Sequence, residues 1–165
     1  MKIYKSGKEL GAHFLTKFRN VPFLSSFSEE YLQEILNASK LVMYQPDESI
    51  IREGELDYKI YVLYSGKVKV TKGGRTIAIF DEIGDIFGEL TMINDEARTA
   101  SVLAVNNTLC LVIDVSFIRQ LNKEDQNACY ALFYSLFSRI LAERLKVTTE
   151  ELADVKAELE MVRRR

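Results

Sequence analysis

The stretch Lys67–Phe80, with the sequence KVKVTKGGRTIAIF, decides the fold class of this 165-residue chain. Its first half alternates polar and apolar side chains, as a half-buried β-strand does. Gly73 and Gly74 then join it to a second strand-like run, Arg75–Phe80. Because the favoured two-residue hairpin turn needs a positive φ at both central positions, the glycine pair predicts an antiparallel hairpin.

Further short runs of β-branched and aromatic residues lie on both sides of the hairpin, separated by turn signals. They are Ile60–Tyr64, Ser101–Val105 and Leu109–Ile113. Many short strands joined by tight turns are typical of a sandwich or a barrel rather than of a parallel sheet. Residues 41–121 are therefore predicted to form an antiparallel β-domain.

The segment that precedes this domain, residues 1–40, is predicted to be helical. Ser28 followed by two glutamates suits a helix N-terminus. The side chains of Leu32, Ile35 and Leu36 then recur at helical spacing and form one apolar stripe.

Residues 122–165 return to a helical period. No glycine or proline follows Gly88, so one helix is predicted from about Asn127 to the end. Between residues 141 and 162 apolar side chains recur at steps of four and three, which is a heptad seam. The a positions are Leu145, Leu152 and Leu159, and the d positions are Leu141, Thr148, Val155 and Val162.

The charges beside this seam favour a parallel homodimer. Glu151 and Lys156 occupy a g position and the following e position, and so do Glu158 and Arg163. The alternative is that the stripe lies along its own domain as core. Thr148 is the polar member of the seam, and its hydroxyl either bonds back to the preceding turn or contacts a ligand.

The candidate binding residues lie in the stretch GDIFGELTM at residues 84–92 and in RTASV at residues 98–102. Gly88 allows the backbone to approach a ligand closely, and a short helix that starts at Glu89 would present free N–H groups to an anion. Arg98 suits a two-pronged contact with a phosphate, and Thr99 adds a hydroxyl. A carboxylate does not bind phosphate, so Glu89 is expected to accept from a sugar hydroxyl. The alternative is a turn with an Arg98–Glu89 salt bridge and no ligand.

Residues 84–102, called the cassette below, resemble the phosphate-binding cassette of the cyclic nucleotide-binding domains. The likeness to this family covers about residues 20–150. The resemblance implies an α+β fold in which an antiparallel β-roll (double-stranded β-helix or jelly roll) is flanked by N-terminal helices and a long C-terminal dimerisation helix. By resemblance, Glu89 receives the ribose 2′-hydroxyl, and Arg98 and Thr99 hold the cyclic phosphate. Ala100 belongs to the same motif, and backbone amides of Gly88, Glu89 and Leu90 contribute.

The segment LKVTTE at residues 145–150 is similar to the C-terminal helix of the bacterial catabolite activator branch. By this resemblance, Thr148 and Thr149 contact the base across the dimer, which favours cyclic AMP, whereas Thr99 is also compatible with cyclic GMP. The activators continue into a helix-turn-helix domain, and no DNA-binding domain is expected from the four residues after Met161. The chain is therefore interpreted as a cytoplasmic, allosteric sensor for an unknown effector protein in signal transduction. A dimeric interaction module that keeps the fold without a ligand is the alternative.

Composition excludes several other classes of function. The 22 basic and 24 acidic residues give a net charge of −2, unlike a chain wrapped in nucleic acid. His13 is the only histidine, so the β-domain lacks the ligands of a cupin-like metalloenzyme, and no metal or enzymatic activity is expected. Cys110 and Cys129 form no disulfide framework. The charge-free stretches are too short to span a bilayer, so no membrane partner is expected.

Overall fold

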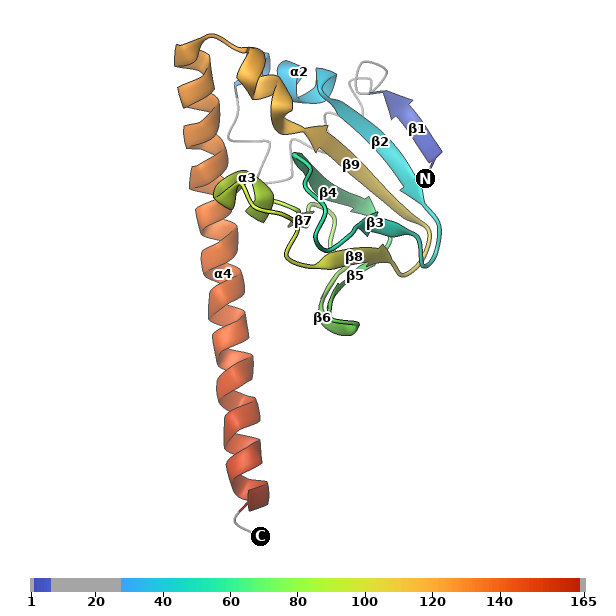
Figure 1. The fold of residues 1–165 in the computed structure, drawn as a ribbon, viewed down its shortest axis with the longest axis vertical. Coiled ribbons are helices and arrows are strands. Elements are labelled where there is room, and N and C mark those ends of the chain that lie inside the picture. The colour runs from blue at the N-terminus through green and yellow to red at the C-terminus, as the bar shows by residue number, and fades with distance from the viewer. Residues whose placement is uncertain (1, 7–27, 164–165) are drawn as a thin grey trace. The chain divides into compact units, whose positions relative to one another are not determined.

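The computed structural model describes residues 2–6 and 28–163 of the chain (Figure 1). It divides into two compact units, Met1–Cys129 and Tyr130–Arg165. The first unit carries the β-structure and the cassette, and the second consists of most of one long helix.

In the described part of the first unit, the strands form two antiparallel sheets. The first has the order β1-β2-β9-β4-β7 and consists of β1 (Lys2–Ser6), β2 (Ser39–Tyr44), β9 (Thr108–Asp114), β4 (Lys59–Ser65) and β7 (Ile86–Phe87). The second has the order β3-β8-β5-β6 and consists of β3 (Ser49–Ile51), β8 (Ser101–Ala104), β5 (Val68–Lys72) and β6 (Arg75–Phe80). Antiparallel sheets with helices on either side in the chain confirm the α+β, β-roll part of the prediction.

The hairpin predicted from the glycine pair is present. Lys72 pairs with Arg75, and Gly73 and Gly74 have φ angles of 55° and 78°. Positive φ at both turn positions is the geometry whose twist matches two antiparallel strands. β5 also pairs with β8 from Val68 to Thr71, so β6 forms an edge of the second sheet.

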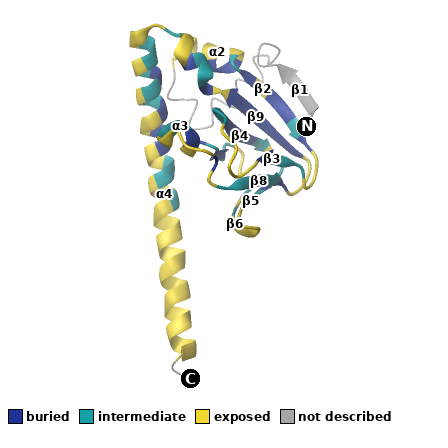
Figure 2. Ribbon diagram, in the orientation of Figure 1, coloured by how far each residue is buried: buried dark blue, intermediate teal, exposed yellow. Residues whose placement is uncertain are grey.

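The core lies between the inner faces of the two sheets. Tyr61 and Leu63 of β4 and Cys110 of β9 belong to the same buried cluster as Val68 of β5 and Val102 of β8. Figure 2 shows that the buried positions follow the strands of the first sheet. Truncating a core leucine such as Leu63 to alanine typically costs about 2–5 kcal/mol, so these side chains fix the sheets that carry the cassette.

The described residues before β2 contain one helix and one strand. Helix α2 (Glu29–Asn37) begins where expected, and the Ser28 hydroxyl accepts from the Tyr31 amide at 3.4 Å. Lys2–Ser6, predicted to be helical, instead pair with β2 as an antiparallel strand. An edge strand leaves a row of unpaired backbone groups, and pairing satisfies them. The helical prediction for residues 7–27 lies outside the described residues.

The C-terminal helix begins four residues before its predicted start at Asn127. After the 3-10 helix η3 (Val115–Gln120), helix α4 (Lys123–Arg163) runs for 41 residues, about 60 Å at 1.5 Å per residue. Glu124 and Asp125 in its first turn and Arg163 in its last complement the helix dipole. Among the described residues, no helix is both long enough and apolar enough to cross a membrane.

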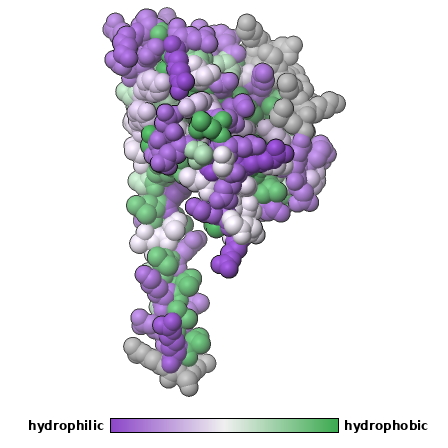
Figure 3. Space-filling model, in the orientation of Figure 1, coloured by the Kyte–Doolittle hydropathy of each residue, from purple (hydrophilic) through white to green (hydrophobic). Residues whose placement is uncertain are grey.

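The distal part of α4 exposes the predicted seam. Leu145, Leu152, Val155, Leu159 and Val162 are all exposed, Leu145 by 68% and Val162 by 70%. Figures 2 and 3 show an exposed helix on which apolar side chains alternate with polar ones.

Candidate functional site

The predicted cassette, residues 84–102, contains β7 and the short helix α3 (Leu90–Asn94), and it ends in β8. Gly88 follows β7 directly, and Glu89 is the N-cap residue of α3. The expected short helix after the glycine is therefore present. Glu89 is buried with 3% exposure, whereas Leu90 is 36% exposed.

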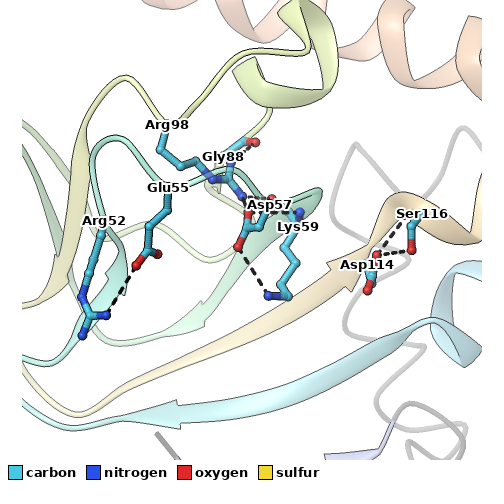
Figure 4. Close-up of polar contacts among 8 residues, drawn as sticks. All are labelled: Arg52, Glu55, Asp57, Lys59, Gly88, Arg98, Asp114 and Ser116. Carbon is cyan, nitrogen blue, oxygen red and sulfur yellow. Dashed lines mark hydrogen bonds and ion pairs between the residues drawn. The ribbon is translucent and has the colours of Figure 1, made fainter.

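Arg98 is the buried cation at the centre of this region. Its side chain is only 3% exposed. Its Nη1 donates to the Gly88 carbonyl at 2.5 Å, and its Nη2 donates to the Lys59 carbonyl at 2.5 Å and to the carboxylate of Asp57. Figure 4 shows Gly88, Asp57 and Lys59 converging on the guanidinium. The Nε–H of Arg98 is buried and has no hydrogen-bond partner among the described residues.

The ion pair that the structure gives Arg98 differs from the one considered from sequence. Its partner is Asp57, 41 residues earlier in the chain, rather than Glu89. Asp57 is 29% exposed and also lies 3.4 Å from the ammonium group of Lys59. Sequence reasoning did not select Asp57, because nothing in its neighbourhood indicates that the turn before β4 folds against the cassette.

A glycine is required at position 88 by the backbone conformation and also by the atoms around it. Its φ is +85°, in the region that side-chain-bearing residues rarely adopt. A Cβ at this position would lie 2.8 Å from Nη1 of Arg98 and 3.1 Å from the Lys59 carbonyl oxygen. The absence of a side chain therefore allows the arginine to contact the backbone.

The backbone of Arg98 is fixed by the turn between β3 and β4. Its amide donates to the Glu55 carbonyl at 2.8 Å, and its carbonyl accepts from the Gly54 amide at 2.8 Å. The guanidinium carbon lies 5.9 Å from the ring centre of Tyr61, which stacks on Phe87 with ring centres 5.3 Å apart. Burial raises the pKa of the Tyr61 hydroxyl and the nearby Asp57 adds to the rise, so this wall of the site stays neutral.

The remaining predicted residues divide between the two units. Thr99 is exposed and Ala100 half-buried, immediately after Arg98 in the first unit. Thr148 and Thr149 belong to α4 in the second unit, and both are exposed. The hydroxyl of Thr149 donates to the Leu145 carbonyl at 2.7 Å, so the back-bond considered for Thr148 is formed by its neighbour.

This arrangement is suited to binding an anion. A buried guanidinium whose Nε–H has no partner in the described part of the chain offers a charged donor, and the absence of a side chain at Gly88 leaves room for that guanidinium. Among the described residues, no group of three or more histidine, cysteine, aspartate or glutamate side chains gathers to hold a metal. A separate hollow of about 320 Å³ has Lys40, Lys59 and Asp114 in its lining and contains no residue of the 84–102 cassette.

Residues 41–125 match the family model described as the cyclic nucleotide-binding domain. The chain belongs to this family. Gly88, Glu89 and Arg98 lie within the matched residues, as do the strands from β3 to β9.

Two curated relatives and one solved structure illustrate the range of similar proteins. The chain is 36% identical to the cAMP-dependent protein kinase regulatory subunit of Schizosaccharomyces pombe over 51% of this chain and 20% of that protein. It is 35% identical to the cGMP-dependent protein kinase of Toxoplasma gondii over 57% of this chain and 9% of that protein. The chain thus spans a fifth or less of the length of these relatives.

The structural likeness extends to the bacterial activators. The catabolite activator protein of Thermus thermophilus superposes with a TM-score of 0.59 at 26% identity, over 82% of this chain and 63% of that one. The resemblance to this branch drawn from residues 145–150 is therefore accompanied by a shared fold.

Proposed function

We propose that this chain is a regulatory sensor domain in which Arg98 binds the cyclic phosphate of a cyclic nucleotide. The observation that carries the proposal is the buried guanidinium of Arg98, whose Nε–H has no partner among residues 2–6 and 28–163. A buried unpaired donor costs about 1–3 kcal/mol, and a phosphate oxygen would remove that cost. The donor is oriented before the ligand arrives, so little ordering has to accompany binding.

The residues around Arg98 divide the recognition of the ligand. The backbone amides of Gly88, Glu89 and Leu90 contribute to the phosphate site, and the Glu89 carboxylate accepts from the ribose 2′-hydroxyl. Thr99 adds a hydroxyl to the phosphate, with Ala100 beside it in the motif. The place of Glu89 supports this division, because it directly follows Gly88, whose carbonyl accepts from Nη1 of Arg98.

Asp57 is the counter-charge of Arg98 in the site. A buried guanidinium without a counter-charge is costly, and the carboxylate of Asp57 offsets that cost in the ligand-free chain. The cyclic phosphate carries one negative charge and shares the guanidinium with Asp57. The partial exposure of Asp57 leaves its carboxylate hydrated when the phosphate competes with it.

The second unit supplies the proposed output. Two copies of α4 form a parallel coiled coil through the seam at 141–162, and Thr148 and Thr149 contact the base, which favours cyclic AMP over cyclic GMP. Binding shifts the position of α4 because the ligand binds one position more tightly than the other. An effector protein in the cytoplasm reads that shift. The exposure of the seam supports the dimer, since exposed leucines at heptad spacing gain by burial.

The relatives support a cyclic nucleotide without separating the two bases. One is named for cAMP and the other for cGMP, at nearly equal identity to this chain. The preference for cyclic AMP therefore rests on Thr148 and Thr149.

Thermal unfolding with and without nucleotide tests the sensor proposal. A ligand that binds only the folded chain stabilises it by RT ln(1 + [L]/Kd), about 2.7 kcal/mol at a hundredfold excess over Kd. Cyclic AMP is expected to raise the melting temperature progressively with concentration. An unchanged melting temperature at millimolar cyclic AMP and cyclic GMP would favour the alternative, a dimeric interaction module that keeps the fold without a ligand.

Base recognition needs its own test. Thr148→Ala is expected to weaken cyclic AMP about tenfold relative to cyclic GMP in calorimetric titration, because a hydrogen bond to the base is lost. An equal affinity for cyclic AMP in the wild type and the variant would remove Thr148 from the site.

A further inference from the structure

Tyr58 contacts the far end of the cassette helix. Its hydroxyl donates to Oδ1 of Asp95 at 2.6 Å. On the other side, the guanidinium carbon of Arg119 in η3 lies 4.6 Å from its ring centre. Its carbonyl accepts from the Val115 amide at 2.9 Å. Tyr58 therefore contacts η3 on one side and Asp95 on the other.

Asp95 is a strained residue at the end of α3. Its φ of 52° and ψ of 35° are left-handed, and its amide donates to the Thr91 carbonyl at 3.0 Å. A left-handed conformation costs a residue with a side chain about 1–2 kcal/mol. α3 has only five residues, too few to keep that geometry by its own hydrogen bonds. The Tyr58 hydroxyl supplies an anchor from outside the helix.

The neighbours of Tyr58 in the sequence contact Arg98, three residues after Asp95. The Asp57 carboxylate and the Lys59 carbonyl both accept from Nη2 of Arg98. Residues 57–59 thus fix Arg98 and, through Tyr58, the C-terminal end of α3. The tripeptide therefore contacts the C-terminal part of the segment 88–98 at two residues, Asp95 and Arg98.

We propose that Tyr58 is a positioning residue for nucleotide binding, one that keeps α3 and Arg98 in a single geometry without touching the ligand. The inference rests on the proposed function. Tyr58 lies outside the cassette, and the affinity for the nucleotide depends on it through the Tyr58–Asp95 hydrogen bond.

Tyr58→Phe tests this, because it removes the hydroxyl and keeps the ring that faces Arg119. Calorimetric titration of the variant with cyclic AMP and with cyclic GMP is expected to give an affinity about three- to tenfold below that of the wild type. Asp95→Asn keeps the size of the side chain and removes its charge, and should lower affinity in the same direction. The double variant should lose little more than Tyr58→Phe alone, because both changes act on one contact: the first removes its donor, and the second replaces the charged acceptor with an amide oxygen.

Tyr31→Phe is the matched control. It breaks a comparable bond, from the Tyr31 hydroxyl to Oδ1 of Asp125 at 3.0 Å, away from the cassette. Its nucleotide affinity should equal that of the wild type. Amide hydrogen exchange without nucleotide provides a second readout, with faster exchange confined to α3 in Tyr58→Phe and absent in Tyr31→Phe.

The outcomes separate the two proposals. Wild-type binding together with unchanged affinity and unchanged α3 exchange in Tyr58→Phe would overturn the role of Tyr58 alone. Equal loss of affinity in Tyr58→Phe and Tyr31→Phe would also overturn it, since the effect would then be one of general stability. Failure of the wild type to bind either nucleotide would overturn the proposed function, and the ligand role of Tyr58 with it.

Discussion

At the scale of single residues, Gly88 has two separate requirements, a positive φ and space for Arg98. Gly88→Ala is expected to destabilise the chain by about 1–3 kcal/mol, because the new Cβ meets a guanidinium nitrogen and a carbonyl oxygen. It should also weaken nucleotide binding, since Arg98 has to move. Chemical denaturation and titration of the same preparation measure both effects.

Gly74→Ala separates the steric effect from the backbone effect. Gly74 has a φ of +78°, close to the +85° of Gly88, and a Cβ there would meet nothing within 4 Å. The control should lose stability through backbone strain alone and bind nucleotide normally. Equal losses of stability in the two variants would contradict the crowding inferred around Gly88.

Cys110 gives a residue-scale prediction that depends on pH. Burial raises the pKa of its thiol to about 12 from the ordinary value of 9.0. Since only the thiolate reacts, about one thiol in ten thousand is ionised at pH 8, against about one in ten for an ordinary cysteine. Native protein should therefore be alkylated at Cys110 only on unfolding, which peptide mass spectrometry can follow. Rapid alkylation of Cys110 in the folded chain at pH 8 would contradict its place in the core.

The contacts of Arg98 mark the limit of local sequence reasoning. Gly88, Glu89 and Arg98 could be selected because their types and spacing fit a phosphate site within a short stretch. Asp57 and Tyr58 could not, because their roles arise only when the turn before β4 folds against residues 88–98. A carboxylate in a turn has no pattern that distinguishes a buried ion pair from a hydrated surface charge.

At the scale of elements, the sequence predicted the features that short-range interactions determine. The glycine pair determined the β5–β6 hairpin, and Ser28 with its following acids determined the start of α2. The strand Lys2–Ser6 was missed because its partner is β2, whose register is set by tertiary pairing. Five residues are too few for a periodic signal to outweigh that pairing.

The exposed seam of α4 carries an element-scale prediction. Leu152→Asp places a charge at an a position and is expected to abolish dimerisation, which sedimentation equilibrium measures directly. Folding of a single chain should change little, because Leu152 is already 51% exposed. Ala153→Asp, at the adjacent exposed b position, is the control and should leave the dimer intact. A monomeric wild type would contradict the parallel coiled coil.

At the scale of the whole molecule, the proposed phosphate site and the proposed output lie in different units. The β-roll holds Arg98, Glu89 and Gly88, and the second unit carries the polar pair at 148–149 on an exposed helix. A ligand couples such parts only to the extent that it binds one arrangement better than another. Nucleotide should therefore stabilise the dimer of the wild type, and Thr148→Ala should reduce that stabilisation while monomeric binding to the cassette persists.

The central claim is that the buried guanidinium of Arg98 is the phosphate-binding group. The most direct measurement is calorimetric titration of cyclic AMP and cyclic GMP into the wild type and into Arg98→Lys, with folding of both checked by circular dichroism. Lysine keeps the charge and loses the guanidinium fork, so the account predicts one saturable site per wild-type chain and at least a tenfold loss of affinity in the variant. Equal affinity in the folded variant, or no binding by the wild type at millimolar nucleotide, would contradict it.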